Sequence, residues 1–116
     1  MISILAGMTT EKITKALGKN VTIIRAMPNL GAEAGQSMTV ICSKNKAGLS
    51  FAETLFAGCG EVVTLPEKML DLVTALSGSG PAYFFYMIEA LISAAESIGL
   101  DRKTASGLVL KTALGS

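Results

Sequence analysis

The sequence predicts an α/β segment followed by an all-α segment, and three observations lead to this fold class. Short β-branched runs alternate with helical apolar patterns as far as about residue 64. Three helical patterns then follow with no strand-like run between them. The chain has 116 residues, of which 50% are hydrophobic and 16% charged, so it is able to bury a core. We therefore expect an α/β part over residues 1–64 and a helical part over residues 65–116, with a junction near residues 64–66.

The first part alternates strand and helix patterns as α/β proteins do. "MISIL" is a short apolar run that ends at Ala6-Gly7, and the helix that follows has Thr9 as its expected N-cap and Gly18 as its stop. Further strands are expected in "VTIIRAM", "SMTVICS" and "EVVTL", and a second helix in "AGLSFAETLFAGCG". This alternation predicts a parallel sheet with crossover connections.

The second part consists of the patterns "LPEKMLDLVTALSG", "GPAYFFYMIEALISAAESIGL" and "DRKTASGLVLKTALGS". Proline pushes the residue before it out of the helical region, so Gly80 is the expected cap and Pro81 the first helical residue. The preceding Ser77-Gly78-Ser79-Gly80 segment has two interpretations. It is either a loop whose free N–H groups, at the positive end of a helix, suit a carboxylate or phosphate, or a tight turn joining two helices.

Composition excludes several classes of partner. Ten basic residues stand against nine acidic ones without a basic run, which predicts neither nucleic-acid binding nor an anionic membrane surface. The chain has no histidine, and Cys42 and Cys59 form no CxxC pair, so we expect no metal site. Both cysteines are interpreted as reduced, small hydrophobic residues of a cytoplasmic protein, without a catalytic role.

No segment has the pattern of a targeting or membrane sequence. "MISILAGM" lacks a basic n-region and is too short for a signal peptide or a membrane span. The longer run over residues 81–100 is interrupted by Glu89 and Glu96, which predicts a soluble helix.

The helix expected after Pro81 carries more apolar surface than one neighbour covers. One face consists of Phe84, Met87, Ile88, Leu91, Ala95 and Ile98, and Tyr83, Phe85 and Ile92 widen it. Glu89, Ser93 and Glu96 form a narrow polar stripe. Two explanations remain: a subunit interface of a homo-oligomer formed by residues 81–116, or the central helix of a larger domain.

Three stretches, "AMPN", "LFAGCGEVV" and "EKMLDLVTALSGSGPAYFFYMIEAL", together resemble the pyrroline-5-carboxylate reductase family. The "DLVTALSGSGPAY" run is the specific part, and the resemblance keeps the family's order and spacing along essentially the whole chain. It implies that residues 1–64 are the C-terminal part of a Rossmann-type NAD(P)-binding domain. Residues 65–116 are then the start of a helical dimerisation and substrate domain. The implied reaction is hydride transfer from NADPH or NADH to 1-pyrroline-5-carboxylate, which gives L-proline.

The sequence also departs from the family. The family begins with a strand, a G-x-G-x-x-G-type turn and a helix that hold the cofactor pyrophosphate, and it later carries a Ser-Pro-Gly-Gly segment. Neither occurs here, so we expect a fragment that is inactive alone. The residues that would distinguish NADH from NADPH belong to the absent part.

The resemblance implies a cofactor site at the ends of two strands. Its residues are Ile4, Leu5, Ala6, Gly7, Met27, Pro28 and Asn29. The side chains of Ile4 and Leu5 are expected in a buried strand, whereas Ala6 and Gly7 allow close approach to the cofactor. Asn29 either bonds the nicotinamide carboxamide or shapes the turn after Pro28.

The resemblance implies a substrate site formed by Glu67, Ser77, Gly78, Ser79 and Gly80. Glu67 is expected near the ring nitrogen of the substrate, although Thr64-x-x-Glu67 also has the spacing of a capping box. Asp71 and Thr74 are expected to point toward the Ser-Gly segment and brace it. No side-chain nucleophile is needed, because the protein orients two bound molecules, so no catalytic residue is assigned.

Two other hypotheses stay open. The chain could belong to another two-domain NAD(P)-dependent dehydrogenase with a helical dimerisation domain. A lysine in the middle of that domain would favour this, and from residue 81 onward only Lys103 and Lys111 occur. Alternatively, the chain is a non-catalytic helical dimerisation module, which would bind a second copy without turnover.

Overall fold

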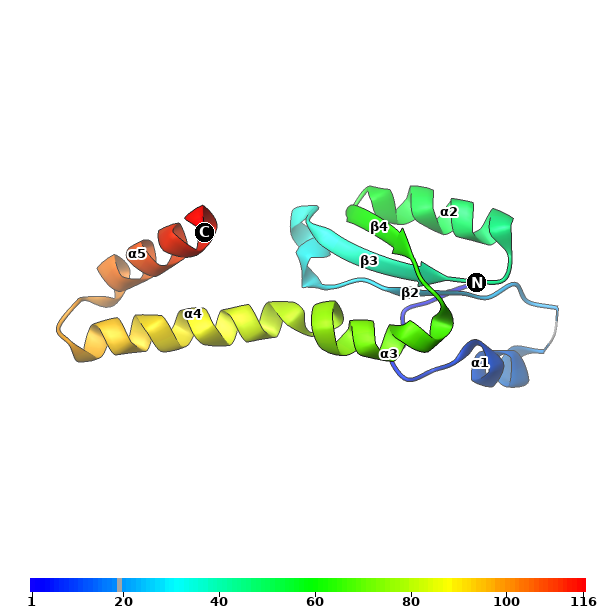
Figure 1. Cartoon of the computed structure of the whole chain (residues 1–116), viewed down its shortest axis with the longest axis horizontal. Helices are drawn as coiled ribbons and strands as arrows, with labels where there is room; N and C mark the ends of the chain where they lie inside the picture. Colours follow the sequence, from blue (N-terminus) through cyan, green and yellow to red (C-terminus); the bar gives the residue numbers. More distant parts are fainter. Residues whose placement is uncertain (19) are drawn as a thin grey trace. The chain divides into compact units, whose positions relative to one another are not determined.

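A four-stranded sheet with the order β1-β2-β3-β4 organises the first part of the chain (Figure 1). The strands are β1 (Ile2–Ser3), β2 (Ile24–Met27), β3 (Ser37–Cys42) and β4 (Gly60–Thr64). The computed structural model describes residues 1–18 and 20–116, which divide by their contacts into the units Met1–Pro81 and Ala82–Ser116. The sheet lies in the first unit.

The sheet is mixed, and the expectation of a purely parallel sheet is wrong at one pair of strands. β1 pairs with β2 and β3 pairs with β4 in parallel, but β2 and β3 are antiparallel, with Arg25 opposite Cys42. The connection between β2 and β3 holds only the short 3-10 helix η1 (Leu30–Ala34). A parallel pair needs a crossover of a dozen or more residues, so this short link returns the chain in the opposite direction.

Helices cover both faces of the sheet (Figure 1). α2 (Lys46–Ala57) lies on one face, and α1 (Thr10–Leu17) and α3 (Leu70–Val73) lie on the other. The first core cluster consists of Ile24, Ala26, Ile41 and Ala52 of α2. The second consists of Met27, Val40, Cys42 and Leu70 of α3. Alternate residues of a strand face opposite sides, so Arg25 and Met27 share the face that α3 covers.

α1 begins and ends where the sequence predicted. The Thr9 side chain accepts a hydrogen bond from the Lys12 N–H, and Gly18 closes the helix with a φ of 88°. Thr9 thereby satisfies one of the four N–H groups that the start of a helix leaves unpaired.

The Ser-Gly segment is not a loop, which corrects one of its two interpretations. After η2 (Glu67–Met69) and α3, the chain forms the π-helical turn η3 (Thr74–Gly78) and continues into α4 (Gly80–Ser97). The Ser79 N–H donates to the Thr74 carbonyl at 2.8 Å, a hydrogen bond between residues five positions apart. α4 therefore starts at Gly80, one residue before the expected Pro81, and Gly80 is helical rather than a cap.

The packing of the first unit extends beyond the expected junction. Leu70 is fully buried in the second core cluster, so the segment from Glu67 onward packs on the sheet. The contact boundary consequently lies after Pro81. The predicted junction near residues 64–66 is a different boundary, because it refers to the two domains of the family. It stays a prediction.

The second unit contains most of α4 and all of α5 (Arg102–Gly115), for which Asp101 is the N-cap. Arg102 donates to Glu89 at 2.6 Å and to Glu96 at 3.0 Å, so two of the three residues in the predicted polar stripe hold the start of α5. Ile92, which was expected to widen the outer apolar surface, is instead buried. Among the helices that the structure describes, none is both long and apolar enough to cross a membrane.

Gly60 provides a test of how β4 is joined to the sheet. Its φ is 139°, and a Cβ at this position would collide with the backbone of Ser37, its partner on β3. We expect Gly60→Ala to lower the free energy of unfolding by about 3 kcal/mol, because it combines a strained backbone with a backbone clash. Urea denaturation measures the change.

Gly58→Ala is the matched control, because Gly58 has a φ of −69° and the nearest atom to its added Cβ would be 3.6 Å away. We expect this substitution to change the unfolding free energy by less than about 1 kcal/mol. Equal effects of the two substitutions would contradict the geometry of β4.

Candidate active site

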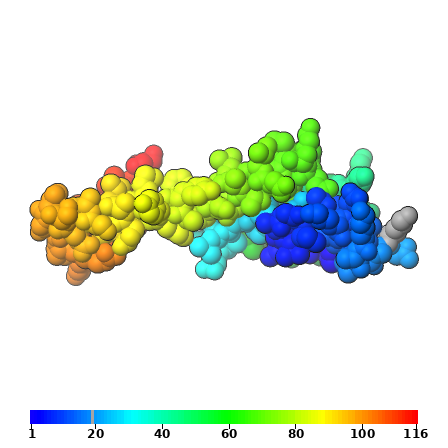
Figure 2. Space-filling view, turned by 90° about the horizontal axis from the view of Figure 1, so that it is seen from below, coloured from blue at the N-terminus to red at the C-terminus, as the bar shows by residue number. Residues whose placement is uncertain are grey.

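Glu67 connects three elements of the first unit. Its Oε1 atom accepts hydrogen bonds from the Thr10 N–H at 2.5 Å, the Thr10 hydroxyl at 2.9 Å and Nη1 of Arg25 at 3.3 Å. Figure 2 shows α1 and the segment that begins near residue 65 side by side. The alternative interpretation of Thr64-x-x-Glu67 as a capping box is wrong, because the N-cap of η2 is Pro66 and no side chain caps it. The Glu67 carboxylate lies instead at the positive N-terminus of α1.

Arg25 is the centre of this arrangement. Its side chain is 2% exposed, and Nη2 donates to the Leu5 carbonyl at 3.2 Å while Nη1 contacts Glu67. Its Nε atom has no hydrogen-bond partner among the described residues. We call Leu5, Thr10, Arg25 and Glu67 the Arg25 cluster. It joins the end of β1, the start of α1, the middle of β2 and the start of η2.

The Glu67 carboxyl is ionised over a wider pH range than an ordinary glutamate. Burial by itself raises the pKa of Glu67, but the two hydrogen bonds from Thr10, the hydrogen bond from Arg25 and the charge of Arg25 together outweigh it. The net effect is a pKa below the usual value. The side chain is 37% exposed, and Oε2 accepts no hydrogen bond from any described residue. Glu67 therefore offers a charged oxygen to a ligand.

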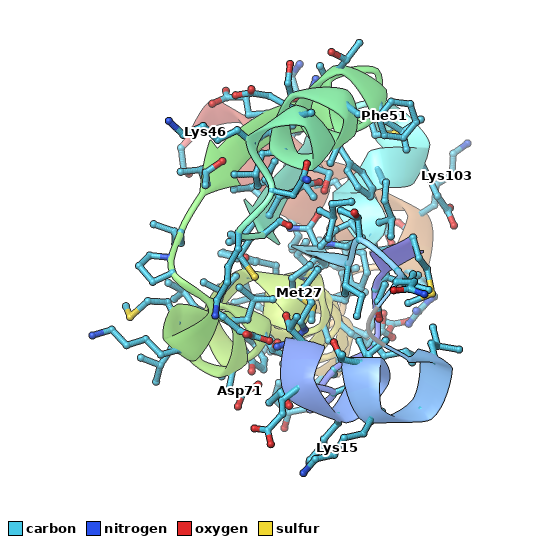
Figure 3. All side chains as sticks on the ribbon, turned by 90° about the vertical axis from the view of Figure 1, so that its right-hand side faces the viewer. Lys15, Met27, Lys46, Phe51, Asp71 and Lys103 are labelled. Carbon is cyan, nitrogen blue, oxygen red and sulfur yellow. The ribbon has the colours of Figure 1, made fainter. Side chains whose placement is uncertain are left out.

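A second group of contacts joins the predicted cofactor segment to the predicted substrate segment. Asn29 follows β2; its Oδ1 accepts from the Gly31 N–H at 3.0 Å, and its Nδ2 donates to the Ser77 carbonyl at 3.1 Å. Met27 lies between the sheet and the helices on that face (Figure 3), and a Cβ at Gly78 would be 3.4 Å from its Sδ. Asn29 thus shapes the turn, as one interpretation proposed, and the second hydrogen on Nδ2 retains donor capacity.

The segment after β1 is open to solvent, contrary to one expectation. Ile4 and Leu5 are 59% and 57% exposed, because β1 ends at Ser3 and their side chains leave the sheet. Gly7 has a φ of 68°, and no atom lies within 4 Å of where its Cβ would be. The carboxyl end of β1 therefore provides exposed backbone and free space, which is what close approach of a cofactor requires.

Some donors of the predicted substrate segment Ser77–Gly80 are already hydrogen-bonded within the helical segment. The Ser77 hydroxyl donates to the Val73 carbonyl at 3.4 Å, and the Ser79 N–H is used within the helical turn. Thr74 supplies the acceptor for Ser79 and its methyl group lies beside Gly78, so Thr74 braces the segment as expected. Asp71 is exposed. No hydrogen bond joins Glu67 to Ser77–Gly80 among the described residues, so the two halves of the predicted substrate site lie in separate clusters.

A cavity of about 390 Å³ opens beside Glu67. Its walls include Thr10 of α1, Cys42 and Lys44 at the end of β3, and Pro66. Burial is the main cause that raises the pKa of the Cys42 thiol, and the Glu67 charge adds to it, so Cys42 stays protonated at neutral pH. This agrees with the prediction that Cys42 is a buried, small hydrophobic residue.

Sequence reasoning missed Arg25. The available signal was a single charged residue inside the continuous apolar run "TIIRAM". The neighbours of Arg25 are buried on both faces of the sheet, and a charge in such a run needs a partner. The partner, Glu67, lies 42 residues further along the chain, so the local pattern did not identify it.

Comparisons with known proteins agree on one family. Residues 67–116 match the family model "Pyrroline-5-carboxylate reductase dimerisation". The chain is 40% identical to pyrroline-5-carboxylate reductase 2 of Bacillus subtilis over 119 aligned residues, which cover 100% of this chain and 43% of that protein. It is 44% identical to the pyrroline-5-carboxylate reductase of Synechocystis sp., covering 100% of this chain and 44% of the relative.

Solved structures give the same result. The pyrroline carboxylate reductase of Plasmodium falciparum with NADP bound is 35% identical and superposes with a TM-score of 0.94 over 99% of this chain and 48% of that one. The reductase of Coxiella burnetii is 40% identical, with a TM-score of 0.86 over 98% and 44%. These matches confirm the predicted fold class, the second half of a Rossmann-type domain followed by the start of a helical dimerisation domain. The chain spans less than half the length of these relatives.

The Asn29–Ser77 hydrogen bond is testable by a substitution that removes only the donor. In Asn29→Asp the carboxylate still accepts from Gly31 but faces the Ser77 carbonyl without a proton to share. We expect a loss of about 1–2 kcal/mol in unfolding free energy, measured by thermal or urea denaturation at neutral pH.

Asn45→Asp is the control. Asn45 caps α2 through Oδ1, which accepts from the Gly48 N–H at 2.7 Å at an exposed position. Aspartate is an equally good cap, so a change within about 0.5 kcal/mol is expected. If Asn29→Asp were as neutral as this control, the Ser77 contact would contribute nothing to stability.

Proposed function

The chain belongs to the pyrroline-5-carboxylate reductase family, and from this we propose that the protein reduces 1-pyrroline-5-carboxylate to L-proline with hydride from a nicotinamide cofactor. The observation that carries the proposal is the 3.1 Å hydrogen bond between Asn29 and Ser77. It joins the segment predicted to hold the cofactor to the segment predicted to hold the substrate. Hydride transfer requires the two molecules to bind next to each other.

The residues at the carboxyl ends of β1 and β2 fit a nicotinamide cofactor. Ile4–Gly7 provides exposed backbone with free space around Gly7, and the Asn29 amide retains a donor for a carboxamide oxygen. The cofactor, when bound, supplies the hydride. Either NADPH or NADH would serve; the relative from Plasmodium falciparum with NADP bound supports the phosphorylated form.

The chain's own residues would orient the substrate and stabilise its charge. The substrate is a cyclic imine whose protonated nitrogen is positive, and the ionised Glu67 carboxylate would favour that form through its free Oε2. As the ring carbon of the C=N bond accepts hydride, the π electrons pass to the nitrogen, which becomes the ring amine of proline. The substrate carboxylate would lie near Ser77–Gly80, where no atom lies within 4 Å of a Cβ added to Gly80 and the backbone leaves room for a ligand.

Proline formation by the longest form of the protein is the direct test. We expect oxidation of NADPH or NADH at 340 nm that depends on 1-pyrroline-5-carboxylate, with proline identified by mass spectrometry. Absence of both turnover and cofactor binding in that form would overturn the proposal and leave the non-catalytic module as the better explanation.

We further propose that the protein forms a homo-oligomer through residues 81–116. Support comes from the match of residues 67–116 to a dimerisation family and from the exposed apolar surface of the second unit. That surface includes Phe84, Met87, Leu91, Leu108 and Leu114, all more than half exposed. A groove of about 480 Å³ between α4 and α5 is lined by several of them. Leaving such side chains in water costs about 1.5–3 kcal/mol each relative to burial.

A charge on this surface tests the oligomer. Leu91→Glu is expected to shift the protein toward the monomer in sedimentation equilibrium, because the carboxylate would be desolvated in the interface. Leu55→Glu on α2 is the matched control, since both leucines are 53% exposed, and it should leave self-association unchanged. A monomeric wild-type protein at micromolar concentration would contradict the proposal.

We also propose a cytoplasmic location. Cys42 and Cys59 are free thiols, which are typical of a reducing compartment and support this part of the proposal.

A further inference from the structure

We propose that Arg25 is the positioning residue of the site, holding the Glu67 carboxylate and the backbone of the Ile4–Gly7 segment in a fixed relation. The inference rests on the proposed function, because it takes Glu67 as a substrate residue and Ile4–Gly7 as a cofactor segment. Arg25 itself would contact neither ligand, because its side chain is only 2% exposed. It acts through Glu67 and through the Leu5 carbonyl.

The geometry of the guanidinium group explains why an arginine occupies this position. Nη1 lies 3.3 Å from Oε1 of Glu67, and Nη2 lies 3.2 Å from the Leu5 carbonyl. These two nitrogens belong to one rigid plane, so the angle and separation between the two acceptors are fixed once Arg25 is fixed. A lysine has a single nitrogen on a flexible stem and would not define both positions at once.

Burying the Arg25 guanidinium costs free energy of desolvation, which its contacts must offset. A charge that is 2% exposed loses its hydration, and an apolar residue of similar volume is often equally stable at such a position. Arg25 also leaves Nε without a partner among the described residues, which adds to the cost. An apolar residue at this position could give similar stability, but it could not make the contacts with Glu67 and Leu5. These contacts are therefore the reason we give for an arginine there.

Arg25 and Thr10 together determine which carboxylate oxygen of Glu67 is exposed. Because Oε1 is occupied by Arg25 and both donors of Thr10, the exposed face of the carboxylate is Oε2. The other groups that face Glu67 come from β3 and its end: the Cys42 thiol, which is protonated, and Lys44 across the cavity, which is exposed. Of the two cations named here, Arg25 is buried and Lys44 is exposed.

The first experiment titrates the Glu67 carboxyl directly by carbon-13 NMR of glutamate-labelled chain. Arg25→Met removes the charge and keeps the volume, so the pKa of Glu67 should rise relative to wild type. Arg25→Lys keeps the charge, so the pKa should stay below that of Arg25→Met. Lys15→Met, which removes an exposed cation of α1 that pairs with Glu11, should leave the pKa of Glu67 unchanged.

The second experiment measures proline formation by the longest form of the protein with the same substitutions. For Arg25→Lys we expect kcat to fall on the order of 10- to 100-fold with little change in KM, because the carboxylate keeps its charge but loses its fixed position. For Arg25→Met the acid limb of kcat/KM should move to higher pH, because Glu67 becomes protonated at higher pH. In Glu67→Gln that limb should be absent.

The two experiments separate the inference from the proposed function. If the pKa of Glu67 is the same in wild type and Arg25→Met, or if Arg25→Lys has wild-type kcat, Arg25 does not position Glu67. If the titration behaves as expected but the wild-type protein forms no proline, the reductase assignment fails while the link between Arg25 and Glu67 stands. Should Arg25→Met fail to fold, Arg25→Lys and its kcat still decide the question.

Discussion

The ion pair between Arg25 and Glu67 is the constraint on which the first unit depends. A buried guanidinium on the middle of β2 must be paired, and its partner comes from the segment that leaves the last strand. Once the pair forms, Glu67 reaches the N-terminus of α1, and Arg25 reaches the carbonyl that follows β1. The pair and its hydrogen bonds therefore join four elements at one point: the segment after β1, the start of α1, β2 and the start of η2.

A second constraint is a hydrogen bond at the other end of the same helical segment. Gly78 faces Met27 there, and an added Cβ would lie 3.4 Å from the Met27 sulfur, at ordinary van der Waals distance. The hydrogen bond from Asn29 to the Ser77 carbonyl lies one residue away. This bond ties the π-helical turn Thr74–Gly78 to the residue that follows β2 by two positions. Together, the two constraints fix both ends of the segment from Glu67 to Gly78 against the sheet.

Much of this organisation was predictable from local patterns, because those patterns reflect local physics. Thr9 and Gly18 bound α1 as predicted, since capping depends on a few neighbouring residues. The antiparallel pairing of β2 with β3 was missed although the short link between them contained the information. Glu67 was predicted as a site residue from the family resemblance, but its pairing with Arg25 was missed, because the two residues lie 42 positions apart and neither local pattern identifies the other. The π-helical turn was likewise missed, since serine and glycine are typical of loops.

The hydrogen bonds between Thr10 and Glu67 span 57 positions of the chain, which has a consequence for the order of assembly. During synthesis the first helix leaves the ribosome long before its carboxylate partner, and until then only Thr9 caps it. Closing a loop of this length costs entropy that the strands between must first offset by pairing. The contacts of Glu67 with Thr10 and Arg25 therefore form only after the chain has been synthesised as far as residue 67. A ribosome that stalls before residue 67 therefore leaves Arg25 without its counter-ion.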